Sequence, residues 1–304
     1  MLKNQISKIR ASYYALFDKL LSIERKVESL QIAVGNIESR QLAEIGSFTL
    51  KDNEFQVFSQ WGEDGILDFL THVVPIKNKI FVEFGVEDYL ESNTRYLLEK
   101  KNWNGLVLDG SSENISKIKR SHYYWKYNIK AVQAFIDKGN INQLLEDNGI
   151  SGDIGLLSVD IDGNDFWVWQ VVETVQPAIV SVEYNSRLGY EKKLTIPYSP
   201  TFSRMEAHES WLFYGASIAA LCKLADMKGY DFVGCNSAGV NAFFVRKDLR
   251  PKKLAALTPK EGFVRGEFRE SRTATGELAL LSAKDEDTII SNLGFVDPYA
   301  KKKN

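Results

Sequence analysis

Three aspartates stand within six residues between positions 160 and 165, in the segment DIDGND. They follow an apolar run, and the glycine and asparagine among them are typical of a tight turn. Such a loop can bind a hard divalent cation, Mg²⁺ or Mn²⁺, through oxygen ligands. The predicted metal ligands are Asp160, Asp162, Glu183 and Asn185. The alternative is structural, with Asp165 capping the following helix and Asp162 holding the turn.

Two more acidic residues end apolar runs upstream, Glu83 in FVEFG and Asp109 in VLDGS. An acid after the second strand binds ribose hydroxyls in nucleotide-type sites, and Gly85 permits close approach of a ligand to the backbone. The segment lacks the G-x-G-x-x-G pattern that suits a pyrophosphate cofactor such as NAD, whereas S-adenosylmethionine contains no phosphate. This favours S-adenosylmethionine as the cofactor. The predicted binding residues are Gln60, Glu83, Gly85, Asp109 and Ser111.

Without a metal, an acceptor hydroxyl needs a general base. Asp160 and Asp162 are candidates, and His208 is a third because it lies in a long polar segment, 186–212, that could cover the site. A metal would instead lower the pKa of the hydroxyl. Four aromatic side chains could form a platform for a sugar ring. They are Trp167, Tyr184, Tyr198 and Trp211. The alternative for Trp167 is packing in the core.

Short apolar runs alternate with helical stretches through the middle of the chain. We predict strands at 79–85, 105–111, 129–135, 154–162 and 178–185, and helices at 92–101, 112–122, 140–148, 165–174 and 214–228. A further capped helix is expected after Ser59, and a β-hairpin at 231–246. This alternation predicts a mostly parallel sheet whose carboxyl edge gathers the acidic residues. We expect an α/β, Rossmann-like sheet of seven strands with a terminal antiparallel hairpin, as in class I methyltransferases.

Apolar residues recur at alternating steps of four and three near the N-terminus. They are Leu2, Ile6, Ile9, Tyr13, Leu16, Leu20, Ile23, Val27, Leu30, Val34 and Ile37. This narrow heptad stripe predicts a continuous coiled-coil helix that self-associates through residues 1–45. The alternative is a helix packed on its own globular domain, which usually shows a wider apolar face.

Composition narrows the class of protein. Apolar residues make up 44% and charged residues 26% of the 304, which is typical of a globular protein with a real core. The net charge of -2 offers no general attraction for nucleic acid, and Lys301, Lys302 and Lys303 are interpreted as a solvated tail. Cys222 and Cys235 suit a reducing compartment. With no signal peptide and no run of ~20 apolar residues, we expect a cytoplasmic protein without a transmembrane segment, or one peripheral to the inner membrane.

Seven segments between about residues 55 and 250 carry a family resemblance. They are SQWGEDG (59–65), FVEFGVEDYLESNTRYLL (81–98), GLVLDGS (105–111), LLSVDIDGNDFWVW (156–169), VEYN (182–185), YGAS (214–217) and GCNSAGVNAFFVR (234–246). In this order they resemble FkbM-type methyltransferases and their relatives in bacterial surface-polysaccharide gene clusters. The resemblance implies a class I fold, S-adenosylmethionine as cofactor, and O-methylation of a sugar or glycan acceptor.

We therefore expect three parts in the chain: a coiled-coil oligomerisation helix at 1–45, a methyltransferase domain at 46–250, and a C-terminal extension at 251–304 without predicted chemistry. Two other functions remain open at this point. One is a metal-dependent hydroxylase or hydrolase on the same fold, and the other is a non-catalytic coiled-coil scaffold.

Overall fold

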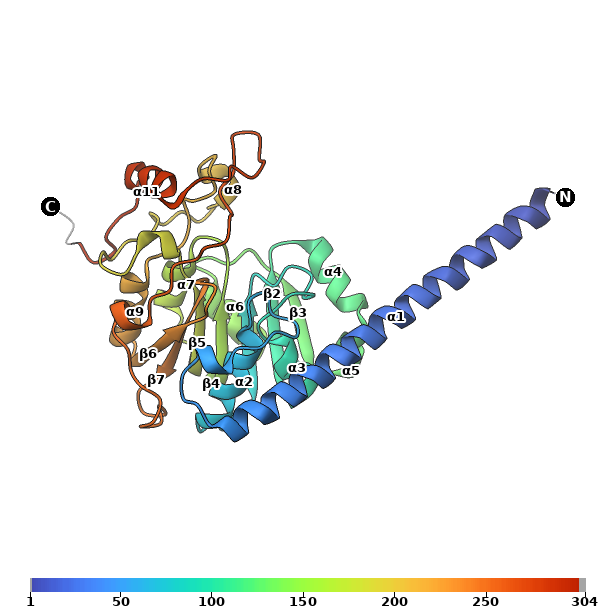
Figure 1. Cartoon of the computed structure of the whole chain (residues 1–304), viewed down its shortest axis with the longest axis horizontal. Coiled ribbons are helices and arrows are strands. Elements are labelled where there is room, and N and C mark those ends of the chain that lie inside the picture. Colours follow the sequence, from blue (N-terminus) through green and yellow to red (C-terminus); the bar gives the residue numbers. More distant parts are fainter. Residues whose placement is uncertain (1, 301–304) are drawn as a thin grey trace.

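A computed structural model describes residues 2–300, so Lys301, Lys302 and Lys303 lie outside the described residues, as does the side chain of Leu2. At its centre is a seven-stranded sheet of order β3-β2-β1-β4-β5-β7-β6 (Figure 1). The strands are β1 (Ile80–Phe84), β2 (Asn104–Asp109), β3 (Ile129–Gln133), β4 (Gly152–Val159), β5 (Val175–Glu183), β6 (Tyr230–Cys235) and β7 (Asn241–Arg246).

The strand pairing confirms the predicted fold class. β1 to β5 pair in parallel, and β7 runs antiparallel between β5 and β6. This is the Rossmann-like arrangement of class I methyltransferases, with the hairpin closing one end of the sheet. The carboxyl ends of the parallel strands meet at one edge, where open α/β sheets bind their ligands.

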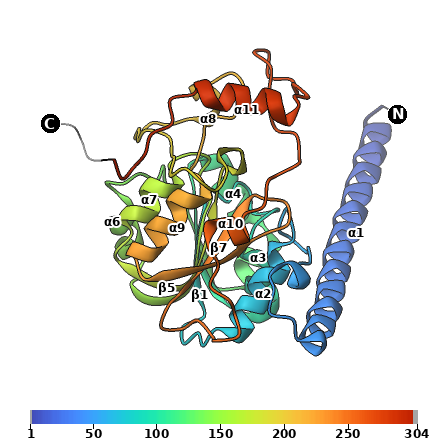
Figure 2. The same ribbon diagram turned by 60° about the vertical axis from the view of Figure 1, so that its left-hand side comes forward.

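Helices cover both faces of the sheet, because successive side chains of a strand point to opposite faces. Val82 and Phe84 of β1 pack with α6, α7 and α9, whereas Phe81 packs with α2, α3, α4 and α5. Figure 2 shows these two helical layers on either side of the strands. The helices are α2 (Glu63–Val73), α3 (Arg95–Lys101), α4 (Ser112–Arg120), α5 (His122–Lys126), α6 (Ile141–Asp147), α7 (Asp165–Val171) and α9 (Ile218–Met227).

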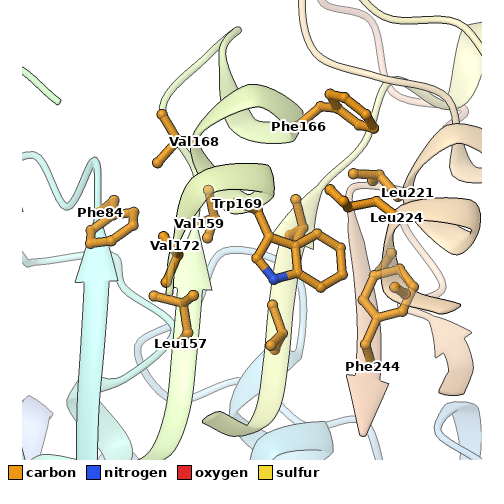
Figure 3. Packing of buried hydrophobic residues seen from close by; sticks show 14 of the residues in the cluster. Phe84, Leu157, Val159, Phe166, Val168, Trp169, Val172, Leu221, Leu224 and Phe244 are labelled. Atoms are coloured by element: carbon orange, nitrogen blue, oxygen red, sulfur yellow. The ribbon is translucent and has the colours of Figure 1, made fainter. Parts of the chain in front are cut away.

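Trp169 of α7 fills the centre of one layer (Figure 3). Its ring lies 5.0 Å from that of Phe244 on β7, centroid to centroid, and only 1% of the residue is exposed. Packing of this kind fixes α7 against the sheet, and α7 begins directly after the DIDGN turn. The core therefore anchors the segment that carries the clustered aspartates.

The N-terminal helix α1 (Leu2–Ile45) confirms the long helix that the heptad stripe predicts. Its first half projects away from the body (Figure 1). The seam side chains from Ile6 to Ile37 are all exposed, between 49% and 69%. A different face of the second half packs on the body, where Ile32 and Leu42 meet a cluster that includes Phe55 and Tyr96. The alternative of packing on the body thus holds for this second face, and self-association through the exposed seam stays a prediction.

The remaining helices are α8 (Arg204–Ala207), α10 (Pro259–Gly262) and α11 (Ala283–Asn292), and 3₁₀ turns lie at Lys51–Asn53 and Ser186–Leu188. The division into 1–45, 46–250 and 251–304 stays a prediction, and side-chain contacts cross both of its boundaries, as Arg95 with Glu28 and Arg187 with Glu286 illustrate. Within residues 2–300, none of the helices combines the length and apolar character needed to cross a membrane.

Candidate active site at the carboxyl edge of the sheet

A cavity of about 620 Å³ opens at the carboxyl ends of β1, β2, β4 and β5. Most of the predicted site residues line it: Gln60, Glu83, Gly85, Asp109, Asp160, Asp162 and Glu183. Its lining contains nine carboxyl groups and two guanidinium groups, those of Arg204 and Arg269. Field lines focus in such a cleft, so it favours cations over anionic ligands.

Glu83 ends β1 with its carboxylate held by the following loop. Oε1 accepts a hydrogen bond from Asn93 N at 2.8 Å, and Oε2 accepts from the hydroxyls of Ser92 and Thr94. Burial raises the pKa of Glu83 to about 7, against the lowering effect of these donors. These bonds also explain why the helix predicted from residue 92 begins at Arg95, since residues 92–94 form the turn that holds Glu83.

Gly85 and the loop after it are tightly constrained. A Cβ on Gly85, which has φ +69°, would lie 1.7 Å from the carbonyl oxygen of Asp160. The missing side chain therefore lets the ends of β1 and β4 approach each other. Glu87, at φ +47°, occupies the left-handed region, which costs a non-glycine residue about 1–3 kcal/mol.

Asp109 holds that loop from the end of β2. Its Oδ2 accepts from Glu87 N at 2.8 Å, and its Oδ1 accepts from Ser111 N at 2.8 Å and from Asn114 Nδ2 at 3.2 Å. A carboxylate offers about four lone-pair sites, so one acceptor position on Oδ2 remains for a ligand in the cavity. Asp109 is only 8% exposed, and that exposure faces the cavity it lines.

Three carboxylates meet at the ends of β4 and β5. Asp160, Asp165 and Glu183 each place an oxygen within 4.8 Å of the others. Oε2 of Glu183 is buried and accepts no hydrogen bond within the described residues. Burial, and next the neighbouring carboxyl groups, raise the pKa of Glu183 and of Asp160 well above their usual values, and burial raises that of Asp165 to about 6.

This cluster differs in membership from the predicted metal ligands. Asp165 belongs to it, although Asp165 also holds the turn by accepting from Ile161 N and Gly163 N at 2.8 and 2.9 Å. Asp162 points outward to Arg204, with 2.9 Å between Oδ1 and Nη1. Asn185 is fully buried and does not line the cavity.

The Asn185 side chain secures the chain after β5. Its amide donates to the carbonyls of Leu212 and Tyr214, both at 3.1 Å, and its Oδ1 accepts from Arg187 N at 3.1 Å. Both side-chain N–H groups and the side-chain oxygen of Asn185 are therefore hydrogen-bonded to backbone groups. An asparagine at this position is explained by its role in holding the loop after β5.

His208 and Ser111 do not line the cavity. His208 Nδ1 lies 2.8 Å from the hydroxyl of Ser210 in a local turn. Ser111 caps α4, where its hydroxyl accepts from Asn114 N. The four residues considered for an aromatic platform also lie off the cavity lining; Trp167, for example, donates from Nε1 to the carbonyl of Ile196 at 2.8 Å.

Arg204 and Glu270 form a roof that the sequence reasoning missed. Arg204 Nη2 lies 2.6 Å from Glu270 Oε2, and its guanidinium stacks 3.6 Å from the ring centroid of Tyr214. Glu270 also pairs with the buried Arg187. The sequence offers one signal for this pair, the closely spaced arginines and glutamates of FVRGEFRESR (263–272). The partners of Glu270 cannot be recognised from this segment alone, because Arg187 and Arg204 lie far away in the sequence.

Aromatic rings lining the cavity come from other positions than predicted. Trp61 and Phe268 stack with 5.1 Å between centroids and 29° between planes, and Phe135 and Phe202 line the same space. Trp61 precedes α2, whereas Phe268 belongs to the C-terminal extension. The extension therefore contributes directly to the site.

Glu63, the first residue of α2, links that helix to the terminal hairpin. It is fully buried, and its Oε1 accepts from Asn236 Nδ2 at 2.6 Å and from Asn241 Nδ2 at 3.0 Å. Asn241 stands opposite Glu183 in the β5–β7 pairing. Its Oδ1 is buried without a hydrogen-bond partner in the described part of the chain, beside the cavity.

Comparisons with known proteins add similarity at the level of whole structures only. No protein-family model and no curated protein matches this sequence. Among solved structures, the N-terminal domain of EvdMO1 with S-adenosylhomocysteine bound is 12% identical, over 68% of this chain and 93% of that one, with a TM-score of 0.39. An O-methyltransferase from Bacillus cereus in complex with S-adenosylhomocysteine is 9% identical, over 70% and 89%, with a TM-score of 0.40.

A third similar structure is an S-adenosylmethionine-dependent methyltransferase from Clostridium acetobutylicum, 11% identical over 60% of this chain and 90% of that one, with a TM-score of 0.38. Likeness of this size does not bear on activity.

Proposed function

We propose that this chain is an S-adenosylmethionine-dependent O-methyltransferase that methylates a hydroxyl of a sugar or glycan. The observation that carries the proposal is the carboxyl-lined cavity at the ligand-binding edge of a Rossmann-like sheet. S-adenosylmethionine supplies a methyl group on a cationic sulfonium, which a negative cavity attracts. A pyrophosphate cofactor would meet nine carboxyl groups there and no glycine-rich helix start.

The predicted cofactor residues suit this ligand. Asp109, with one acceptor position free on Oδ2, is placed to accept from a ribose hydroxyl. Oε1 of Glu83 accepts a single hydrogen bond from the protein, so a cationic amino group can approach it. Gln60, in the segment before α2, contributes a polar side chain to the cavity lining.

The proposal includes assistance by Mg²⁺ or Mn²⁺ at Asp160, Asp165 and Glu183. Of the other predicted ligands, Asp162 pairs with Arg204 and the Asn185 side chain binds backbone groups. The unpartnered Oε2 of Glu183 supports a cation here, because a buried carboxylate oxygen without a donor is costly. A bound divalent cation would lower the pKa of a coordinated hydroxyl. Oxygen ligands alone are the donor set that these hard cations prefer.

The chain also offers a base for a metal-free route. Methyl transfer breaks the bond between the sulfonium sulfur and the methyl group, forms a carbon–oxygen bond at the acceptor and leaves S-adenosylhomocysteine. The hydroxyl proton passes to a general base, for which the cavity offers carboxylates. Asp160 is the candidate, because its raised pKa makes its ionised form a better proton acceptor and it lines the cavity. Asp162 is tied to Arg204, and His208 lies off the lining.

The acceptor would lie under the roof made by the C-terminal extension. Trp61 and Phe268 present an aromatic pair at the cavity, and flat aromatic faces pack well against sugar rings. A role in polysaccharide biosynthesis follows from this acceptor class. The two free cysteines are in keeping with a cytoplasmic location, peripheral to the inner membrane if the glycan is membrane-linked.

Self-association through residues 1–45 belongs to the same proposal. The exposed seam of α1 would leave a continuous apolar stripe in water unless a second copy covers it. An assembly would hold several sites near one repetitive acceptor and thereby raise the effective concentration.

Isothermal calorimetry tests the function. We expect the full-length protein to bind S-adenosylhomocysteine, with added Mg²⁺ or Mn²⁺ giving a second, chelator-sensitive binding event. If S-adenosylhomocysteine binds neither with nor without metal, the methyltransferase proposal is refuted. A non-catalytic coiled-coil scaffold would then be the favoured alternative. Metal binding without cofactor binding would instead favour the metal-dependent hydroxylase or hydrolase.

A further inference from the structure

The face of α1 that packs on the body is distinct from the heptad seam. This second face also repeats at steps of four and three, but it begins one residue after the seam residue Val27. Its residues are Glu28, Ile32, Gly35, Ser39 and Leu42. These are the b and f positions of the heptad, which point away from a partner helix in a coiled coil. α1 can therefore contact the body and a second helix at the same time.

The central contact of this face is an ion pair in an apolar setting. Arg95, only 1% exposed, lies 2.7 Å from Glu28 of α1 and 2.9 Å from Glu99 of its own helix. Its guanidinium is sandwiched between the rings of Phe58 and Tyr123, at 4.1 and 4.5 Å from their centroids. A buried guanidinium depends on such partners, because an unpaired buried charge is strongly destabilising.

Arg95 directly follows the turn that holds Glu83 in the cavity. The Arg95 backbone N–H donates to the hydroxyl of Ser92 at 3.2 Å, and that hydroxyl donates to Glu83 Oε2 at 3.1 Å. Ser92 N in turn donates to the carbonyl of Phe58, at 3.2 Å, whose ring stacks on Arg95. A continuous set of contacts thus runs from α1 to the end of β1.

We propose that Glu28 is a positioning residue, which acts through Arg95 to hold loop 85–94 in the conformation that binds the cofactor. The proposal rests on the proposed function for the identity of that ligand. It makes the N-terminal helix part of the binding site's architecture as well as a surface for self-association. Loss of the Glu28 carboxylate would leave Arg95 with one ion-pair partner and loosen the turn at 92–94.

Two single substitutions in the full-length chain test the coupling. Glu28→Gln removes the charge that pairs with Arg95. Ser39→Ala is the matched control, because Ser39 docks the same helix by donating to Asp68 Oδ2 at 2.6 Å and neither residue lines the cavity. We expect S-adenosylhomocysteine affinity to fall at least about fivefold in E28Q, the low end of coupling between sites, and to stay near wild type in S39A.

Glu28→Asp keeps the charge and should recover part of the lost affinity, which a general loss of stability would not predict. Both E28Q and S39A should keep the wild-type molar mass by light scattering, because neither residue belongs to the seam. Wild-type affinity in E28Q, or equal losses in E28Q and S39A, would overturn the proposal.

Amide hydrogen exchange provides a readout that needs no ligand. Amides of residues 92–94 should exchange faster in E28Q than in wild type or S39A. If the wild type binds no S-adenosylhomocysteine, the methyltransferase proposal fails, but faster exchange at 92–94 still supports the coupling and unchanged exchange overturns it.

Discussion

Arg204 and Glu270 pair across the cavity, with 2.6 Å between Nη2 and Oε2, although 66 residues separate them in the chain. Glu270 also accepts from the hydroxyl of Tyr214 at 3.0 Å and pairs with Arg187. One carboxylate of the C-terminal extension therefore pairs with two guanidiniums of the body. This relationship makes the extension a cover of the site.

Glu270→Ala should release this cover. Removing one partner of a buried ion pair costs about 3–5 kcal/mol when the remaining charge is left uncompensated. The cost here should be smaller, because Arg204 keeps Asp162 and Arg187 keeps Glu286 as partners. We expect trypsin to cleave within residues 263–282 faster in this variant than in wild type. Glu277→Ala is the control, since Glu277 is exposed on the same segment and forms no ion pair in the described chain. Equal cleavage rates in all three proteins would contradict the covering role.

Asp109→Ala should weaken S-adenosylhomocysteine binding by about tenfold or more, since a hydrogen bond to a charged group contributes about 1.5–3 kcal/mol. Asp137→Ala is a matched control: Asp137 also accepts backbone N–H groups in a turn after a strand, but it does not line the cavity. Calorimetry measures both affinities. Unchanged binding by the Asp109 variant would refute its ribose role.

Glu183→Gln should reduce Mn²⁺ or Mg²⁺ affinity at least about tenfold, because even residues that only orient metal ligands typically contribute that much. Titration calorimetry with the metal chloride gives the affinity. Glu91→Gln removes another carboxylate from the cavity lining without touching the cluster and should bind metal as wild type does. If methyl transfer is observed and a chelator does not reduce it, the metal-assisted route is refuted. The metal-free route with Asp160 as general base would then be favoured.

The pH dependence of stability follows from the same carboxyl cluster. The pKa of Asp165 is raised to about 6, and those of Asp160 and Glu183 are raised well above their usual values. A carboxyl group with a higher pKa in the folded chain contributes most at low pH, and this contribution is lost as the pH rises through the folded pKa.

With chelator present, the free energy of unfolding should therefore decrease as the pH rises from about 4, the pKa of an unfolded carboxyl group, through about 6, the folded pKa of Asp165. Urea denaturation at each pH measures it. Saturating Mg²⁺ should reduce the decrease, because the cation stabilises the ionised carboxylates. Glu183→Gln should also flatten the dependence, and a stability that rises over this range would show that the cluster does not dominate it.

Leu20→Glu, in the exposed seam of α1, should disrupt self-association by placing a charge in the interface. Ser22→Glu is the control, because it places the same charge two residues away and outside the seam. It should leave self-association unchanged. Light scattering gives the molar mass of each full-length protein. A wild-type protein that is monomeric at all concentrations tested would disprove the coiled-coil assembly.

Much of the fold could be predicted because its signals are local. The β-branched runs and the turns between them located all seven strands to within a few residues, as for β3, predicted at 129–135 and found at Ile129–Gln133. The heptad stripe likewise predicted α1. The site was predicted less fully, because Asp165 and Asn185 are both of the right type for a metal ligand in sequence. Only the structure shows that Asp165 lies beside Asp160 and Glu183, whereas the Asn185 side chain binds backbone groups of the chain after β5.

The sequence by itself determined the sheet, the long helix and the edge at which the acidic residues gather, since these follow from periodicity and from the direction of parallel strands. Only the tertiary structure decided which polar groups share the cavity. Arg204, Phe268 and Glu270 reach it across long sequence separations, and α1 reaches its loop through Arg95. The physical reason is that ion pairs and aromatic stacking depend on distances in space, which residue spacing along the chain does not encode.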